Sequence, residues 1–169
     1  MKWLLAIFSF FVLGQCFSQD PVDSEETFDE RYARNIKKSR INGVYIPKNM
    51  DEAMTELQAL RSDEALDKFK KGDEAMVARK LHFGLGRWMI YNWNFYEGSR
   101  FSHYLSQQGL THPDDQAQLV IVSLHRKLNA KDLDLMGQIE TLSSARAEER
   151  NKKVKVIKEE TRIRDNHRG

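Results

Sequence analysis

The sequence is almost without cysteine, since Cys16 is the only one among 169 residues. Cys16 lies in an N-terminal segment that we expect to be removed, so the mature protein would contain none. A chain without cysteine can form no disulfide framework, no thiolate nucleophile and no cysteine-ligated metal site. We therefore expect stability to come from a packed core, for which about 150 residues are enough.

An excess of one charge is also missing. The chain has 27 lysines and arginines against 25 aspartates and glutamates, a formal net charge of +2. Removal of Lys2 with the N-terminal segment brings the mature chain closer to neutrality. Because a nearly neutral protein has no general attraction for polyanions, we expect no nucleic-acid partner.

Long hydrophobic runs are limited to one, at residues 3–13. Lys2 precedes this run, and the small-residue positions Cys16 and Ser18 follow it, which is the pattern of a secretory signal peptide. The run is shorter than the about 20 residues that a membrane-spanning helix needs. We predict cleavage after Ser18, no transmembrane span in the mature chain, and a periplasmic or extracellular location.

Two other interpretations of the N-terminal segment stay open. The run could be a buried helix or a membrane anchor. Cys16 could also carry a lipid, although Gln15 stands before it, where lipidated signals usually have Gly, Ala or Ser. Ordinary cleavage explains the pattern with the fewest departures.

Residues 19–41 form a polar leader in which acidic residues come first and basic residues follow. Phe28, Tyr32 and Ile36, at four-residue spacing, are compatible with a short amphipathic helix, and a mobile leader is the alternative. The pair Asn42-Gly43 then predicts a turn. Residues 44–47 predict a brief extended entry into the following domain.

Helical signals dominate residues 42–142, and no strand alternation interrupts them. Helices are expected to begin near Asn49, Ser62, Asp73, Gly84, Arg100, His112 and Asp132. The helix after His112 is the most apolar and should occupy the centre. The sequence therefore predicts an all-α domain, a compact bundle of about six or seven short helices.

The composition changes after Ser143, where nine basic residues face five acidic ones. Sparse apolar residues such as Val154 and Ile157 cannot bury much surface there. Residues 143–169 are predicted to be either a long charged helical extension or a disordered basic tail. No aromatic residue offers a stacking surface in this segment, so a solvated helix end is preferred to a specific binding arm.

Aromatic residues concentrate between Phe83 and Tyr104, which hold eight of the twelve aromatics of the mature chain. Filling the core is the simpler role for such rings, and helical spacing supports it for Trp88. Trp93, Phe95 and Tyr96 instead fall in a loop that contains Asn and Gly. We expect some exposure of these three rings, which would suit a stacking platform for sugars or an anchor for a protein partner.

The sequence His112-Pro113-Asp114-Asp115 is the second candidate site. Its simpler interpretation is local: Thr111 or His112 caps a helix, Pro113 occupies the first turn, and the aspartates face the positive end of the helix dipole. No histidine pair has the spacing of a zinc site, and no catalytic serine, phosphate loop or cofactor motif is found. We expect no metal and no cofactor.

Several short motifs together resemble a known family. They are Asn42–Pro47, His82–Trp88 (His-Phe-Gly-Leu-Gly-Arg-Trp), Gly98–Arg100, His112–Asp115 and His125–Asn129. In order and spacing they are similar to uncharacterised domains of Bacteroidetes-type bacteria, classed as a domain of unknown function, over residues 42–140. The resemblance implies one compact domain and a bacterial source, and it supplies no activity, cofactor or site residue.

The chain also departs from that family pattern. Ile90 stands where an arginine is typical, and residues 116–118 replace a Met-Ser-Gly run. A site shared by the family would therefore be altered in this protein.

Three functions remain as hypotheses. The leading one is a non-enzymatic module that binds another protein or a cell-envelope component. The second is an envelope-acting hydrolase or metal-assisted enzyme in which His82, His112, the two aspartates and His125 converge. The third is an immunity or inhibitor protein. The candidate binding residues are Trp88, Asn92, Trp93, Phe95, Tyr96, Arg100, His112, Asp114 and Asp115.

Overall fold

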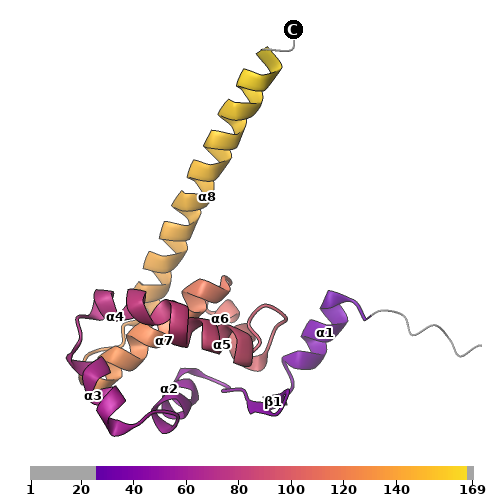
Figure 1. Cartoon of the computed structure of the whole chain (residues 1–169). Coiled ribbons are helices and arrows are strands. Elements are labelled where there is room, and N and C mark those ends of the chain that lie inside the picture. Colours follow the sequence, from indigo (N-terminus) through magenta and orange to yellow (C-terminus); the bar gives the residue numbers. More distant parts are fainter. Residues whose placement is uncertain (1–25, 167–169) are drawn as a thin grey trace, which may run out of the picture.

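The computed structural model describes residues 26–166 and is almost entirely helical (Figure 1). The all-α prediction is confirmed, because the only strands in this range are two residues long each. The expected signal peptide, residues 1–18, and the first part of the leader, up to residue 25, lie outside the described residues.

The helices follow one another with short connections. They are α1 (Phe28–Asn35), α2 (Met50–Ala59), α3 (Asp63–Lys71), α4 (Glu74–Leu81), a π-helical segment η1 (His82–Gly86), α5 (Arg87–Asn92), α6 (Arg100–Gln107), α7 (Pro113–Leu128) and α8 (Leu135–Asn166). Three starts agree with the predicted capping residues: the side chains of Asn49, Ser62 and His112 each accept a backbone N–H of the first turn, and Ser99 does the same before Arg100.

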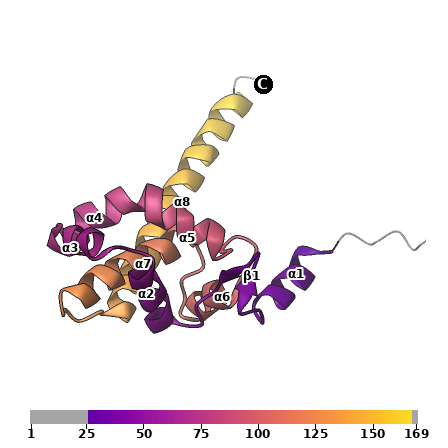
Figure 2. The same cartoon turned by 60° about the horizontal axis from the view of Figure 1, so that its bottom comes forward.

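The leader is helical from Phe28, which agrees with the amphipathic alternative. It is followed by a small hairpin in which β1 (Arg40–Ile41) pairs antiparallel with β2 (Val44–Tyr45). Asn42 and Gly43 both have positive φ angles, of 49° and 81°, as a two-residue hairpin turn requires. Figures 1 and 2 place α1 and this hairpin at the opposite end of the helical body from α3 and α4.

One prediction about helix boundaries is wrong. The sequence predicts that a new helix starts near Gly84, whereas α4, η1 and α5 form one continuous helical stretch. The π-helical turn accommodates both glycines without a break. Gly86 faces α7, where an added Cβ would lie 3.6 Å from Ile121 and 3.7 Å from Ala117, while an added Cβ at Gly84 would meet nothing within 4 Å.

Helix α7 lies at the centre of the fold, as its apolar content predicts. It packs against α2, α4, η1, α5 and α8, and residues along almost its whole length are buried. Completely buried Trp93 and Phe101 fill the core beside it. Because so many elements meet on α7, its few exposed polar positions lie at the borders between neighbouring helices.

Helix α8 has two halves with different surroundings. Its first three turns run back along α7 and bury Gln138 and Ile139. Beyond Arg146 the helix continues away from the body (Figure 1), and the side chains described from Glu148 to Arg162 are exposed. Residues 143–166 thus continue the helix, which corresponds to the helical-extension alternative.

Candidate functional site

The aromatic loop does not form the surface that the sequence suggested. Trp93 and Phe95 are only 1% and 5% exposed, so the expectation of exposure is wrong for both rings, and only Tyr96, at 63%, is open to solvent. Trp93 packs edge-on against Trp88 and Phe101, with ring centroids 5.8 and 5.4 Å away. Burying these large rings stabilises the core more than display on a loop could, so they serve packing.

Two other candidate residues are held by contacts within the fold. The Asn92 amide donates to the Trp88 carbonyl oxygen at 2.9 Å, closing the end of α5. The Arg100 Nε donates to the Ile46 carbonyl oxygen at 2.7 Å, and its guanidinium lies 5.0 Å from the centre of the Tyr45 ring. Arg100 therefore attaches the hairpin to α6.

The sequence His112–Asp115 caps α7 as predicted. The His112 Nδ1 accepts the backbone N–H of Asp114 at 3.3 Å, and Pro113 is the first helical residue. Asp115 has a further partner that the sequence did not reveal. Its carboxylate receives two hydrogen bonds from Arg146 on α8, at 2.6 and 3.0 Å. This bidentate pair joins the start of α7 to α8.

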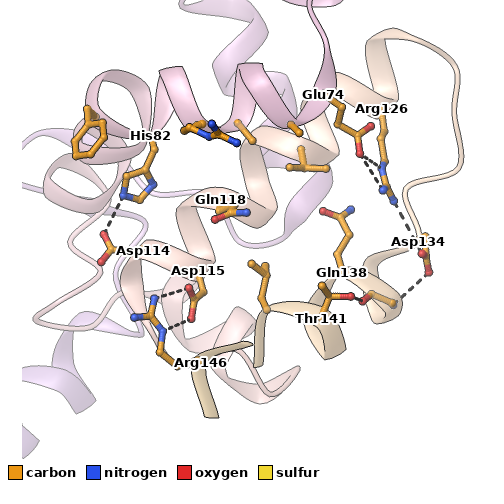
Figure 3. Close-up of a pocket in the computed structure, with 17 residues that line it drawn as sticks. Glu74, His82, Asp114, Asp115, Gln118, Arg126, Asp134, Gln138, Thr141 and Arg146 are labelled. Atoms are coloured by element: carbon orange, nitrogen blue, oxygen red, sulfur yellow. Dashed lines mark hydrogen bonds and ion pairs between the residues drawn. The ribbon is translucent and has the colours of Figure 1, made fainter. Parts of the chain in front are cut away.

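A groove of about 730 Å³ begins at this pair and runs between α4 and α8, with α7 as its floor (Figure 3). We call it the polar groove. It is lined by Glu74, Ala75, Ala78, Arg79, His82, Phe83, Asp114, Asp115, Gln118, Val122, Arg126, Asp134, Gly137, Gln138, Thr141, Leu142 and Arg146. Its volume is that of an ordinary small-ligand site.

Ion pairs hold both ends of the polar groove. Asp115 and Arg146 form one end, and the carboxylate is only 10% exposed. At the other end Glu74 accepts hydrogen bonds from Nε and Nη2 of Arg126 at 3.1 and 3.0 Å. These bonds lower the pKa of Glu74, and the carboxylates beside them raise the pKa of both arginines. The charges at both ends are therefore fixed in place before any ligand arrives.

Between these ends lie side chains with unused hydrogen-bonding capacity. Gln118 is exposed near the middle of the groove, and Arg79 lies on its α4 wall. Within residues 26–166, neither side chain makes a hydrogen bond or an ion pair. His82 Nε2 lies 3.4 Å from the Asp114 carboxylate, and the neighbouring Phe83 ring is 74% exposed. The groove thus offers an amide, a guanidinium, an imidazole and an open ring face to a ligand.

The residues proposed for an enzyme converge only in part. His82, Asp114 and Asp115 line the groove, but His125 is a buried core residue whose Nε2 lies 2.9 Å from the Gly72 carbonyl oxygen. His112 contacts Asp114 at 3.7 Å outside the groove lining. Among the described residues, no three histidine, cysteine or acidic side chains gather closely enough to hold a metal ion.

Sequence reasoning found the aspartates but missed their surroundings. Arg146 lies 31 residues from Asp115, and Arg126 lies 52 residues from Glu74, so only the fold brings these pairs together. One local signal was present: Asp114, Gln118 and Val122 recur at four-residue spacing and mark a face of α7 that is not fully apolar.

Of the comparisons with known proteins, only the one with protein families found a match, and it supports the expectation of a domain of unknown function. No protein of curated function and no solved structure matches the chain. In the described part of the chain, no helix combines the length and apolar character needed to cross a bilayer. Residues 46–128 match a family described as a domain of unknown function (DUF6794). This range is just under half of the chain and includes the α4 wall and the α7 floor of the polar groove.

Proposed function

We propose that the protein is an exported binding module and that the polar groove binds a polar component of the cell envelope. Export is supported by the N-terminal pattern of Lys2, the apolar run at residues 3–13 and the small residues at Cys16 and Ser18. Binding is supported by one observation above all. The groove has its charged ends already paired, and it keeps Arg79 and Gln118 without partners among the described residues.

A saccharide fits this arrangement best. Sugar hydroxyls both donate and accept hydrogen bonds, so they can use the Gln118 amide and the Arg79 guanidinium at once. An apolar face of a sugar ring can pack on the exposed ring of Phe83, which lies at the edge of the same groove. Arg79 is the one unpaired cation among the described side chains of the groove, so a ligand with several charges would have to displace one of the existing ion pairs.

The test is a titration of the protein with soluble peptidoglycan fragments. Calorimetry measures the binding, and the NMR chemical shifts of groove residues locate it. Parallel titrations use the glycan strands without peptide and the stem peptides without glycan. We expect the glycan to bind, with Gln118→Ala and Arg79→Ala each weakening it about tenfold, which corresponds to the loss of one good hydrogen bond. Arg87→Ala is the matched control, because Arg87 is exposed on α5 and does not line the groove. Equal binding by all three variants would contradict a role for the groove.

A hydrolase is the second candidate, and the His82–Asp114 pair is the observation that favours it. An imidazole 3.4 Å from a carboxylate can be oriented as a general base toward a water molecule in the groove. Incubation with the same fragments, followed by mass spectrometry, separates the two functions. Products that appear with the wild-type protein and disappear with His82→Gln would support catalysis, and unchanged fragments would leave binding alone.

A further inference from the structure

The opposite face of α4 borders a second cavity, of about 520 Å³, which we call the apolar pocket. It is lined by Leu57, Arg61, Ala65, Leu66, Lys68, Phe69, Val77, Lys80, Leu81, Gly84, Leu85 and Leu124. Leu57, Leu85 and Leu124 form a buried floor that belongs to the core. None of these residues lines the polar groove, so the pocket is a separate site that does not depend on the function proposed above.

Helix α3 is the outer wall of the apolar pocket, and it is attached to the body at its C-terminal end, where the Asn129 amide donates to the Lys70 carbonyl oxygen at 3.1 Å. None of its nine residues is buried, although Leu66 and Phe69 face the body and are half-covered. Its outer face is held by the ion pairs Glu64–Lys68 and Asp67–Lys71 at four-residue spacing. A helix with an amphipathic pattern and an apolar face that is only half-covered leaves hydrocarbon surface available to a ligand.

The charges around the pocket have one sign. Arg61, Lys68 and Lys80 are exposed lining residues, and no acidic residue lines the pocket. Lys68 is paired with Glu64, whereas Arg61 and Lys80 have no ion pair within residues 26–166. Two unpaired cations beside a hydrocarbon cavity attract a ligand that has an apolar body and an anionic end.

We propose that the apolar pocket binds a single long-chain fatty acid. The hydrocarbon chain would lie over the three buried leucines, and the carboxylate would lie between Arg61 and Lys80. One flexible chain suits a concave pocket of this volume between α2, α3, α4 and α7 better than a flat membrane surface does. A neutral apolar ligand would leave both cations unused.

Calorimetry with dodecanoate, below its micelle concentration, tests the proposal on the whole protein. Each methylene added between octanoate and dodecanoate should lower the dissociation constant roughly fourfold, because it buries one more CH₂ group. Dodecanol should bind at least tenfold more weakly than dodecanoate, and dodecyltrimethylammonium more weakly still. Equal affinity for the anion and the cation, or no dependence on chain length, would overturn the proposal.

Two kinds of variant locate the binding. Gly84→Leu adds a side chain at the pocket, from a position where an added Cβ meets nothing within 4 Å, and it should weaken dodecanoate binding at least tenfold. The double variant Arg61→Glu/Lys80→Glu removes the cations from exposed positions and should weaken binding by a similar factor. Lys70→Glu, an exposed change on α3 outside the pocket lining, should leave the dissociation constant within twofold.

The outcomes distinguish the possible occupants. Undiminished dodecanoate binding by both Gly84→Leu and the double variant would overturn the site. A second copy of the chain is the other possible occupant. It would be assigned to the pocket if dodecanoate does not bind, if the mass in ultracentrifugation rises with protein concentration, and if the pocket variants abolish that rise. Loss of glycan binding in the groove would affect neither result.

Discussion

The two faces of α4 border sites of opposite character. On α4 and the adjoining η1, one face carries Ala75, Ala78, Arg79 and His82 and looks into the polar groove, and the other carries Val77, Lys80, Leu81 and Gly84 and looks into the apolar pocket. The groove is organised by paired charges drawn from α4, α7 and α8. The pocket is organised by leucines of the core, with cations only at its border.

This difference shows how one short helix can serve two recognition surfaces. The strength of an ion pair depends on its geometry, on pH and on neighbouring charges. The strength of a hydrocarbon contact depends mainly on the buried area and on shape. The groove should therefore respond to changes of charge and the pocket to changes of size.

Removal of the pocket floor should have the largest effect. Leu124 is 2% exposed, and we expect Leu124→Ala to lower the free energy of unfolding by about 2–3 kcal/mol, because the loss of buried methyl groups leaves a void. Urea denaturation measures this change. Leu66→Ala, on the half-covered face of α3, is the control and should cost about 1 kcal/mol or less. Equal costs would mean that the floor is not part of the core.

Breaking the ion pair of the groove should come next. Arg146→Ala leaves the Asp115 carboxylate without its partner, and we expect a loss of about 1–2 kcal/mol, below the value for a fully buried pair because the Arg146 side chain is 35% exposed. Arg150→Ala, on the exposed part of α8, should change stability by less than about 0.5 kcal/mol. A loss as small as that control would show that the pair contributes little to holding α8.

The pH dependence of stability should separate the polar groove from the apolar pocket. The pKa of Glu74 is lowered in the folded protein by hydrogen bonds from Arg126, so its stabilisation is present above the ordinary glutamate pKa. This stabilisation is lost as the pH falls through the lowered pKa that Glu74 has in the folded protein. In urea denaturation at pH 7 and pH 3, Glu74→Gln should therefore lose less stability on acidification than the wild type. Leu124→Ala, which removes no charge, should keep the wild-type slope.

The smallest effect should come from Gly84→Ala. The position is helical with open space around an added Cβ, so a methyl group reduces the freedom of the unfolded chain and should stabilise the protein by about 0.5 kcal/mol. Thermal unfolding measures the shift. Gly43→Ala gives the opposite case, because the positive φ of 81° in the hairpin turn strains any L side chain. Destabilisation by Gly84→Ala would mean that the π-helical turn itself requires glycine.

Local signals in the sequence predicted much of the fold. Asn49, Ser62 and His112 each cap the helix they were expected to cap, since a side-chain oxygen or nitrogen near an unpaired N–H acts within three residues. The Asn42-Gly43 turn is equally local. The wrong boundary at Gly84 has a physical reason: glycine permits a chain break without enforcing one, and packing of Gly86 against α7 keeps the helix continuous.

The candidate sites were less accessible to such reasoning. Exposure of Trp93 and Phe95 was inferred from their loop, yet a loop can fold inward when its rings fill a core. Asp115 was read as a helix-end charge, and its pairing with Arg146 depends on how α8 returns along α7. The apolar pocket could not be foreseen, because Leu57 and Leu124 read as ordinary core residues until the arrangement of α3 is known.

The far half of α8 amplifies any tilt of the helix relative to the body. About 20 residues of helix beyond Arg146 extend for about 30 Å, and within residues 26–166 the Asp115–Arg146 pair is the last ion pair that joins α8 to the body. A tilt of about 10° at that point would move the far end by about 5 Å, given the 1.5 Å rise per residue. A molecule bound to the far end of α8 would therefore shift the α8 wall of the polar groove. A ligand that narrows the groove would in turn change the direction of the far half of α8.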